Sequence, residues 1–402
     1  MTHVLVSGAS IAGLTTAHWL RRHGFTVTVV EKAPGLRSGG QAIDIRGVAL
    51  TVVERMGILE QIRQHVTGFR GMTVVDADGR ELMSTTEETF SGGRLDGEDL
   101  ELFRDDLNEI IHGTLDDGIE FRFADSIAAI TQTGSRTHVT FESGLRRDFD
   151  IVVGADGLHS HTRRIAFGPE SDYIRSLHAH IGIFSIPNYL GLDRWQVMQH
   201  LGDTTAMVYT TRRPGGARAI IGFKDEDLEY DHRDVALQRR LLAAGFAGIG
   251  WEVPRLLELA AEAPDFYFDT MAQIHMPAWS TGRVGLVGDA AYCGSPLTGQ
   301  GTSLALVGGY VPAGELAAAA GDPAGLRAYE TEMREYVRLN QRLAVERNPD
   351  NSPVPELMAA AVNGIDVKDY RTVRAPAGVA TRPGRGRRYH APSGYPPVES
   401  AA

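Results

Sequence analysis

Three glycine-rich turns are the parts of this 402-residue sequence best suited to chemistry. They read GASIAG at residues 8–13, GADG at residues 154–157 and GDAAYCGSPLTGQG at residues 288–301. A short apolar run precedes each turn and predicts a buried strand. Open α/β sheets bind ligands outside the carboxyl ends of their strands. We therefore expect the three turns to lie together and to hold one ligand.

The first turn has dinucleotide-binding spacing, with Ser10 in place of the middle glycine. Gly8 allows a tight turn, Ser10 is small enough to let a pyrophosphate approach, and Gly13 lets the helix pack on the strand. The helix N-terminus that follows offers N–H groups and the positive end of its dipole to phosphates. Glu31 ends the next strand and can accept hydrogen bonds from ribose hydroxyls. The turn predicts an ADP-containing cofactor, either NAD or FAD.

The third turn is suited to a flat, bulky group. Asp289 comes at the carboxyl end of a strand, Pro296 fixes the chain, and Gly299 and Gly301 remove side chains. Thr302 then opens a helix of small residues, whose N-terminus can stabilise negative charge on a reduced ring system.

The second turn allows two interpretations. Asp156 lies between glycines at a strand end, and Ser160, Arg163 and Arg164 follow in a predicted helical turn. One interpretation is that Asp156 and Gly157 bind the ligand. The other is that Asp156 caps the helix and leaves the arginines exposed. Taken alone, this turn favours the capping role.

The elements that must position these turns follow from the apolar periodicity. A strand–helix–strand unit opens the chain and predicts a parallel sheet covered on both faces. The predicted strands of this part are 3–7, 26–31, 150–157 and 283–290, and the predicted helices are 11–23, 48–65, 99–116 and much of 302–348.

Between about residues 176 and 275 the pattern changes to short β-rich segments separated by turn signals, which predict an antiparallel sheet. These segments are 178–186, 195–201, 205–211 and 217–223. Asp78-Gly79 predicts a further hairpin within residues 71–90.

Composition limits the function further. The formal net charge of −11 argues against nucleic acid as the main partner. We find no signal peptide and no apolar run of membrane-spanning length, and the single cysteine, Cys293, permits no internal disulfide, so we expect a cytoplasmic protein with no membrane partner. The histidines are scattered without metal-ligand spacing, and we expect no metal.

Together the three ordered turns resemble those of the class A flavoprotein monooxygenases, the para-hydroxybenzoate hydroxylase-like group, over about residues 3–335. The resemblance implies bound FAD, with NAD(P)H as a transient co-substrate that reduces it. It implies that reduced flavin reacts with dioxygen and that the resulting flavin hydroperoxide hydroxylates an aromatic or polyketide-like small molecule. Biosynthesis and inactivation of an antibiotic are both compatible contexts, and a monomer or a homodimer is expected.

By the same resemblance, the first turn would hold the FAD pyrophosphate and Glu31 the adenosine ribose. Arg104 would reach the phosphate–ribityl region, Asp289 the ribityl chain, and the third turn the flavin ring, with Arg46 loosely matched beside the flavin. The expected cofactor-binding residues are Gly8, Ser10, Ile11, Ala12, Gly13, Glu31, Lys32, Arg46, Arg104, Asp156, Gly157, Asp289, Pro296, Gly299, Gly301 and Thr302.

The expected fold is α/β. A Rossmann-like FAD-binding domain, mainly a parallel sheet, carries an inserted antiparallel-sheet substrate domain and a C-terminal helical segment. We assign residues 1–70, 100–175 and 276–335 to the FAD-binding domain, residues 71–99 and 176–275 to the substrate domain, residues 336–370 to C-terminal helices and residues 371–402 to a disordered tail.

No catalytic side chain can be assigned from the sequence. His180 is our first candidate for a polar group above the flavin, because its distance from the second turn matches the family. Gln199 and Tyr209, on neighbouring strands, and Pro296 are further substrate-pocket candidates. For the first three a structural role is equally compatible, since alternation does not say which face is the pocket.

Alternative functions stay open. A flavin halogenase is one, although the four tryptophans do not form that group's Trp-x-Trp motif. A nicotinamide dehydrogenase would leave the second and third turns unexplained. A non-catalytic flavin-binding protein is a third, because Tyr292 and Ser303 stand where many relatives have His and Asn.

Overall fold

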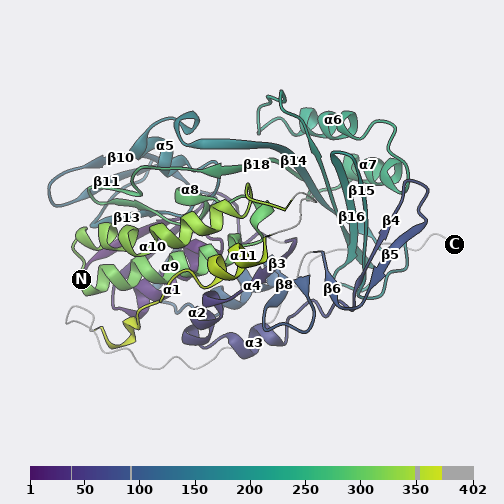
Figure 1. The fold of residues 1–402 in the computed structure, drawn as a ribbon. Coiled ribbons are helices and arrows are strands. Elements are labelled where there is room, and N and C mark those ends of the chain that lie inside the picture. The colour runs from purple at the N-terminus through teal and green to yellow at the C-terminus, as the bar shows by residue number, and fades with distance from the viewer. Residues whose placement is uncertain (38, 91–92, 349–353, 374–402) are drawn as a thin grey trace.

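The computed structural model describes residues 1–37, 39–90, 93–348 and 354–373. Within these residues, six strands form the sheet that carries the glycine turns, in the order β19-β20-β13-β1-β2-β9. Figure 1 labels β13 of this sheet, in the body that also contains the N-terminus. Five of them run parallel, and β19 pairs antiparallel with β20. The strands are β1 (His3–Ser7), β2 (Thr26–Glu31), β9 (Ile119–Phe123), β13 (Ile151–Gly154), β19 (Ser280–Thr281) and β20 (Val284–Leu286).

Alternating apolar side chains bury both faces of this sheet. Val4 and Val6 on β1 belong to a large core that includes residues of α1 (Ile11–Arg22) and α9 (Gly301–Ala318). Leu5 points the other way, into a second core shared with a three-stranded sheet and α5. That sheet is β10 (Ile127–Gln132), β11 (Thr137–Phe141) and β12 (Arg146–Phe149). The period-two pattern of β1 therefore explains why the sheet is covered on both sides.

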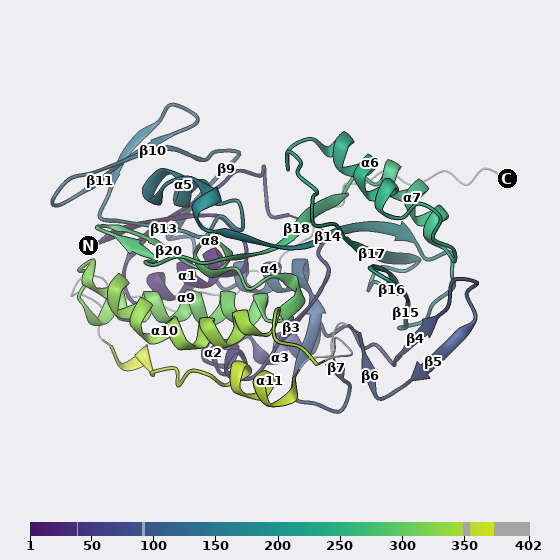
Figure 2. The same ribbon diagram turned by 45° about the horizontal axis from the view of Figure 1, so that its top comes forward.

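A second, seven-stranded sheet lies beside the first body, with strand order β18-β14-β17-β16-β15-β4-β5. Its neighbours pair antiparallel, except that β4 and β15 pair parallel. Figure 2 shows β14 and β18 reaching from the parallel-sheet body into this sheet. The strands are β4 (Met72–Val75), β5 (Glu81–Thr85), β14 (Ile174–Pro187), β15 (Gln196–Leu201), β16 (Thr204–Thr210), β17 (Gly216–Lys224) and β18 (Tyr267–Ile274).

Two helices, α6 (Val235–Gly245) and α7 (Val253–Glu262), cover the outer face of the second sheet. The β-rich interpretation of residues 176–275 did not include them. Leu242 of α6 packs where a side chain at Gly182 would stand, which leaves room for the helix against β14. The inner face of the sheet points toward the parallel-sheet body.

The remaining elements connect these layers. They are β3 (Ala42–Ile45), α2 (Val48–Met56), α3 (Leu59–Arg63), β6 (Glu88–Thr89), β7 (Gly93–Arg94), β8 (Leu100–Phe103), α4 (Arg104–His112), α5 (His161–Phe167), η1 (Glu170–Asp172), α8 (Asp289–Tyr292), η2 (Pro296–Thr298), α10 (Ala324–Arg342), α11 (Pro355–Val362) and η3 (Tyr370–Thr372).

The predicted α/β class is confirmed, with a mainly parallel sheet, an antiparallel sheet and C-terminal helices. Two predicted helices were wrong in detail. Residues 48–65 form two helices, α2 and α3, because Gly57 ends α2 in the left-handed conformation. Residues 99–116 do not form one helix, because residues 100–103 pair with β3 as strand β8 before α4 begins. The boundary expected at residue 335 falls inside the continuous helix α10. Of the expected disordered tail, residues 374–402 lie outside the described residues.

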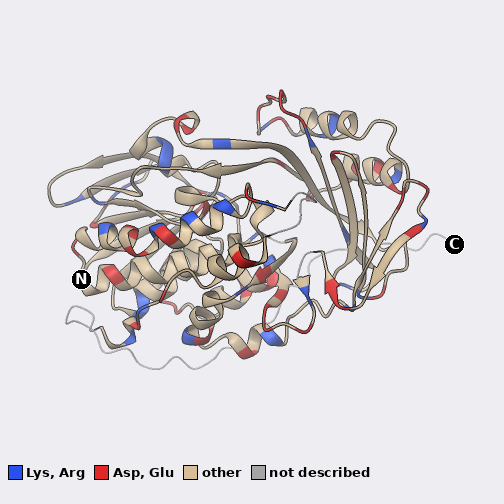
Figure 3. Ribbon diagram, viewed as in Figure 1, with Lys and Arg blue, Asp and Glu red and all other residues tan. Residues whose placement is uncertain are grey.

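The distribution of charged residues and the hydropathy of the helices can be examined directly in the structure. Figure 3 shows acidic and basic residues mixed over both sheets and their helices. Among the described residues, the helices that are long enough to cross a bilayer are not apolar enough to do so.

Candidate functional site

The carboxyl ends of β20, β13, β1 and β2 are consecutive in the sheet, so the three turns meet. A Cβ placed on Gly8 would lie 2.4 Å from the Ala155 carbonyl oxygen, which puts the first turn against the second. A Cβ placed on Gly288 would lie 2.9 Å from the Ala12 Cβ, which puts the third turn against the first. Gly8 and Gly288 also have positive φ angles of 108° and 61°. Both positions therefore need glycine for conformation and for space.

Glu31 holds the first turn in place. Its buried carboxylate accepts hydrogen bonds from the Ala9 N–H and the Ala33 N–H, both at 2.8 Å. Carboxylate oxygens have further lone pairs, so these bonds leave Glu31 able to accept from a ligand hydroxyl. The exposed side chain of Lys32 follows at the strand end.

We expect Glu31→Ala to weaken FAD binding by about 1–3 kcal/mol, because ligand hydroxyls and backbone N–H groups lose their acceptor. Titration of the apoprotein with FAD measures the effect. Glu258→Ala, which removes an exposed glutamate from α7, is the control and should bind FAD as the wild type does. Equal affinity of the Glu31 variant and the wild type would show that Glu31 is not a ligand.

Arg104 connects the first turn to the third. Its guanidinium Nη2 lies 3.4 Å from the Ser10 Oγ, and it begins helix α4. Burial and the nearby Arg37 lower the pKa of Arg104, whereas Tyr267 and Asp289 act in the opposite direction. Arg104 and Asp289 therefore influence each other's pKa through their charges.

Asp289 has the character of a ligand-binding carboxylate. It retains solvent-accessible surface, yet protein surrounds it on most sides, and this burial raises its pKa. The Cys293 thiol and Arg104 oppose the rise only in part. A side chain that is both accessible and desolvated lines a concave site and gains stabilisation when a ligand donates to it.

The third turn leaves free space, as a cradle for a flat group requires. A Cβ on Gly299 or Gly301 would meet no atom of the described residues within 4 Å, and Pro296 is also exposed. Thr302 is buried at the start of α9. Ser295 is held at φ 78° and ψ 148°, a conformation that is ordinarily confined to glycine and that clusters at functional sites. The residues present therefore fit a bound flavin ring.

In the second turn Asp156 bonds to the start of α5, but the N-cap residue is Ser160, whose hydroxyl accepts from the Arg163 N–H at 2.9 Å. The Asp156 carboxylate accepts from the Ser160 hydroxyl and, at 2.8 Å, from the N–H and hydroxyl of Thr162. The expectation of exposed arginines was wrong for Arg163, which is fully buried. Gly157 has φ 83° and open space where a Cβ would be.

Arg163 ties the second turn to the third. Its guanidinium donates to the carbonyls of Ala290 (3.0 Å) and Leu158 (2.6 Å) and to the Glu170 carboxylate (2.6 Å). This role could not be predicted from the sequence, because the local pattern around Arg163 does not identify these partners.

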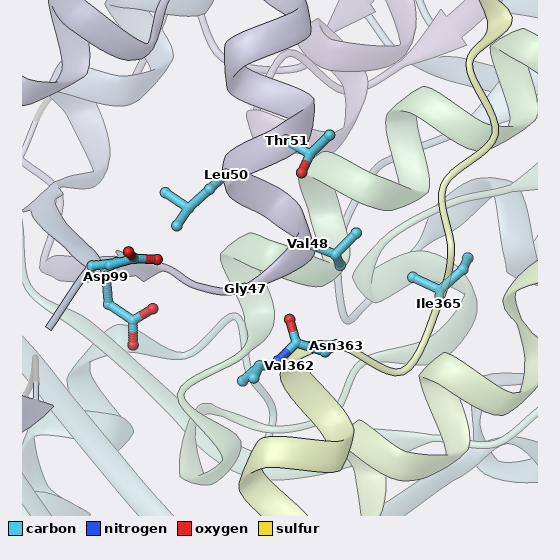
Figure 4. A pocket seen from close by; sticks show the side chains of 9 residues that line it. Gly47, Val48, Leu50, Thr51, Asp99, Val362, Asn363 and Ile365 are labelled. Carbon is cyan, nitrogen blue, oxygen red and sulfur yellow. The ribbon is translucent and has the colours of Figure 1, made fainter.

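Arg46 lies next to the start of α9, as its N–H donates to the Ser303 hydroxyl at 3.1 Å. Its guanidinium pairs with Asp44 (3.0 Å) and approaches Asp99 (3.8 Å). Burial raises the pKa of Asp44 to about 7 although Arg46 opposes it. A cavity of about 500 Å³ lies beside this segment, between the start of α2, Asp99 and residues 362–365 (Figure 4), rather than over the three turns.

The structure does not bring the substrate-pocket candidates together. Tyr209 is on the inner face of the second sheet, where its hydroxyl accepts from the Ala42 N–H at 3.2 Å and its ring packs near Phe103. His180 and Gln199 are on the outer face, because strand pairing aligns them with residues under α6. We therefore drop both from the proposed pocket.

His180 and Gln199 both contact other groups of the protein in ways that indicate a structural role. The His180 ring lies among Phe223, Tyr230 and Phe268, and burial lowers its pKa. The Gln199 side chain donates to the Asp76 carbonyl at 3.4 Å. In the described part of the chain, we find no group of three His, Cys, Asp or Glu residues arranged to hold a metal ion.

The meeting of the three turns at the carboxyl edge of the parallel sheet is the arrangement typical of a dinucleotide-binding flavoprotein. Residues 1–168 match the family described as FAD binding domain. The chain is 40% identical to a flavin-dependent monooxygenase of an unknown prokaryotic organism, over 91% of this chain and 98% of the relative. It is 49% identical to the protein Rv1260 of Mycobacterium tuberculosis strain H37Rv, over 92% of this chain and 100% of that protein.

Among solved structures, the chain is similar to tetracycline destructase Tet(51), with a TM-score of 0.84 and 35% identity, over 92% of this chain and all of that one. The chain belongs to the flavin-dependent monooxygenase family. Its expected resemblance to the class A aromatic hydroxylases is thereby confirmed.

Proposed function

We propose that this enzyme uses NAD(P)H and dioxygen to hydroxylate an aromatic or polyketide-like small molecule through a flavin hydroperoxide. The observation that carries the proposal is the contact of the three glycine turns at one sheet edge, where the Arg104 guanidinium also reaches Ser10. The similarity to Tet(51) over the full length of that protein supports a polyketide-like substrate.

In this proposal FAD, when bound, supplies the electron transfer and the activation of dioxygen. The protein binds and orients it. The first turn and Glu31 would hold its ADP half, Arg104 and Asp289 its central chain, and the loop from Pro296 to Thr302 its ring. The N-terminus of α9 would stabilise negative charge on that ring.

The inner face of the second sheet is suited to an aromatic substrate. Met198, Met207 and Ile220 pack around Tyr209 on this face. Methionine and isoleucine side chains supply the apolar contact that a ring system requires, and methionine adapts to irregular shapes. Tyr209 itself is fully buried among these side chains, and burial keeps the pKa of its hydroxyl well above its ordinary value, so the phenol stays neutral.

The test is oxidation of NADH or NADPH by the purified yellow protein, followed with oxygen uptake and mass spectrometry. Tetracycline and a panel of phenols serve as probe substrates. We expect at least one of them to accelerate NAD(P)H oxidation and to yield a product heavier by one oxygen atom. Halide incorporation would instead indicate a halogenase, and absence of flavin from the folded protein would overturn the proposal.

A further inference from the structure

A chain of hydrogen bonds leads from the second glycine turn to the inner face of the second sheet. His159, which follows that turn, is bonded to the Glu170 carboxylate through Nδ1 (2.8 Å) and to Asp269 Oδ1 through Nε2 (3.1 Å). Asp269 Oδ2 accepts from the Tyr267 hydroxyl at 2.8 Å. Glu170 is also the partner of Arg163, so the chain is continuous with the buried contact to the third turn.

Tyr267 ends this chain on the inner face of the second sheet. It pairs with Ile183 and Asp269 pairs with Ile181, so both side chains share the inner face that looks toward the parallel-sheet body. The Tyr267 side chain is 49% exposed, an unusual exposure for a tyrosine whose pKa is raised well above its ordinary value by burial and by Asp269. Gly39 lies between this end of β18 and the start of α4: its N–H donates to the Asp105 carboxylate at 3.0 Å, and a Cβ placed on it would lie 3.0 Å from Asp265 Oδ2. The charges of Asp289 and Arg104 also act on the pKa of Tyr267.

The direction of the hydrogen bonds decides what Tyr267 offers to a ligand. Its own proton is directed at Asp269, which is buried and also accepts from the Thr270 N–H at 2.8 Å. The phenol oxygen therefore presents only lone pairs to the groove. A hydroxyl group is the complementary donor, and Asp289 alongside has the same preference.

We propose that Tyr267 accepts a hydrogen bond from a hydroxyl of the cofactor's ribityl chain, and that His159, acting through Asp269, is the positioning residue that holds the phenol in this orientation. This inference rests on the proposed binding of FAD in the groove. It adds a side chain of the second sheet to a site that is otherwise built from the parallel-sheet body.

The charge state of His159 makes the arrangement dependent on pH. Although partial burial works against it, hydrogen bonds and charge attraction from Asp269 and Glu170 raise the pKa of His159 to about 9. The other groups that face it are Arg163, through Glu170, and His232, whose ring stacks on it at 4.2 Å. The ion pairs of protonated His159 with Asp269 and Glu170 are fully formed below pH 6.5, and they are lost as the pH rises through about 9.

The experiment measures FAD and ADP affinities of the apoprotein from pH 6 to pH 10. At pH 7 we expect Tyr267→Phe to bind FAD about 5- to 10-fold more weakly, the effect of one lost hydrogen bond, and to bind ADP normally. His159→Gln should weaken FAD similarly. The difference between the wild type and Tyr267→Phe should shrink above pH 9, whereas His159→Gln should show no such step.

Two control variants make the same substitutions at exposed positions outside the proposed site. Tyr189→Phe changes another exposed tyrosine of the second sheet's loops, and His138→Gln breaks an exposed histidine–aspartate pair. Both should bind FAD as the wild type does. Equal FAD affinities of Tyr267→Phe and Tyr189→Phe would overturn the inference and leave the proposed function intact. Failure of the wild type to bind either FAD or ADP would overturn both, and Tyr267→Phe decides the question if His159→Gln does not fold.

Discussion

The Asp289→Ala variant should purify almost free of FAD, with an affinity at least about 100-fold below that of the wild type. A carboxylate that accepts hydrogen bonds from ligand hydroxyls contributes about 1.5–3 kcal/mol for each bond. Asp289 is placed to accept more than one, since it is accessible in the groove beside Arg104. Absorbance of the purified protein and titration with added FAD measure the loss.

The same substitution should not destabilise the apoprotein. Burial raises the pKa of Asp289, so its ionised form destabilises the folded chain at every pH above the ordinary aspartate pKa. Removing it is expected to leave the free energy of unfolding at pH 7 unchanged or slightly higher, as often occurs at binding sites. Asp193→Ala, which removes an exposed aspartate, is the control for FAD content. Full FAD content in Asp289→Ala, or a clear loss of apoprotein stability, would contradict a ligand-binding role.

Replacing Arg163 with alanine should lower the free energy of unfolding by about 2–4 kcal/mol, because each backbone carbonyl that loses its donor costs about 1–3 kcal/mol. Arg163 is fully buried and donates to two carbonyls and to Glu170. Its loss leaves the Ala290 and Leu158 carbonyls without this donor and separates the second and third turns. Urea unfolding of the apoprotein measures the effect.

Arg164→Ala is the matched control. In the described part of the chain, the Arg164 guanidinium is hydrogen-bonded only to the His161 ring. We expect its effect on unfolding to stay below about 0.5 kcal/mol, as for most surface substitutions. Similar stabilities of the two arginine variants would show that Arg163 does not hold the turns together.

Much of the fold could be predicted because it depends on local patterns. The alternation in residues 3–7 and the spacing around Gly8 predicted a strand, a turn and a helix, and the structure has them as β1 and α1. The helices α6 and α7 were missed. They lie within residues 176–275, where the β-rich segments and turn signals were more evident than the helical spacing.

The candidate site could be predicted only at positions where the backbone conformation or the packing admits a single residue type. Glycine at positions 8 and 288 is required by a positive φ and by close packing, and such positions are visible in a sequence. His180 was misplaced because a strand alternates between two equivalent faces, and only the helices on one side decide which face is inner. Tyr267 gave no signal, since its role depends on Asp269 and on a histidine more than a hundred residues away.

The strand order has a consequence for how the chain is made. The central strand β1 pairs with β2 at once, but its other neighbour, β13, is about 145 residues downstream, and β13 in turn needs β20 beyond residue 283. Contacts between such distant segments form slowly. A nascent chain on the ribosome therefore carries an unfinished sheet edge until most of the protein has been synthesised, and such an unpaired edge is prone to aggregation.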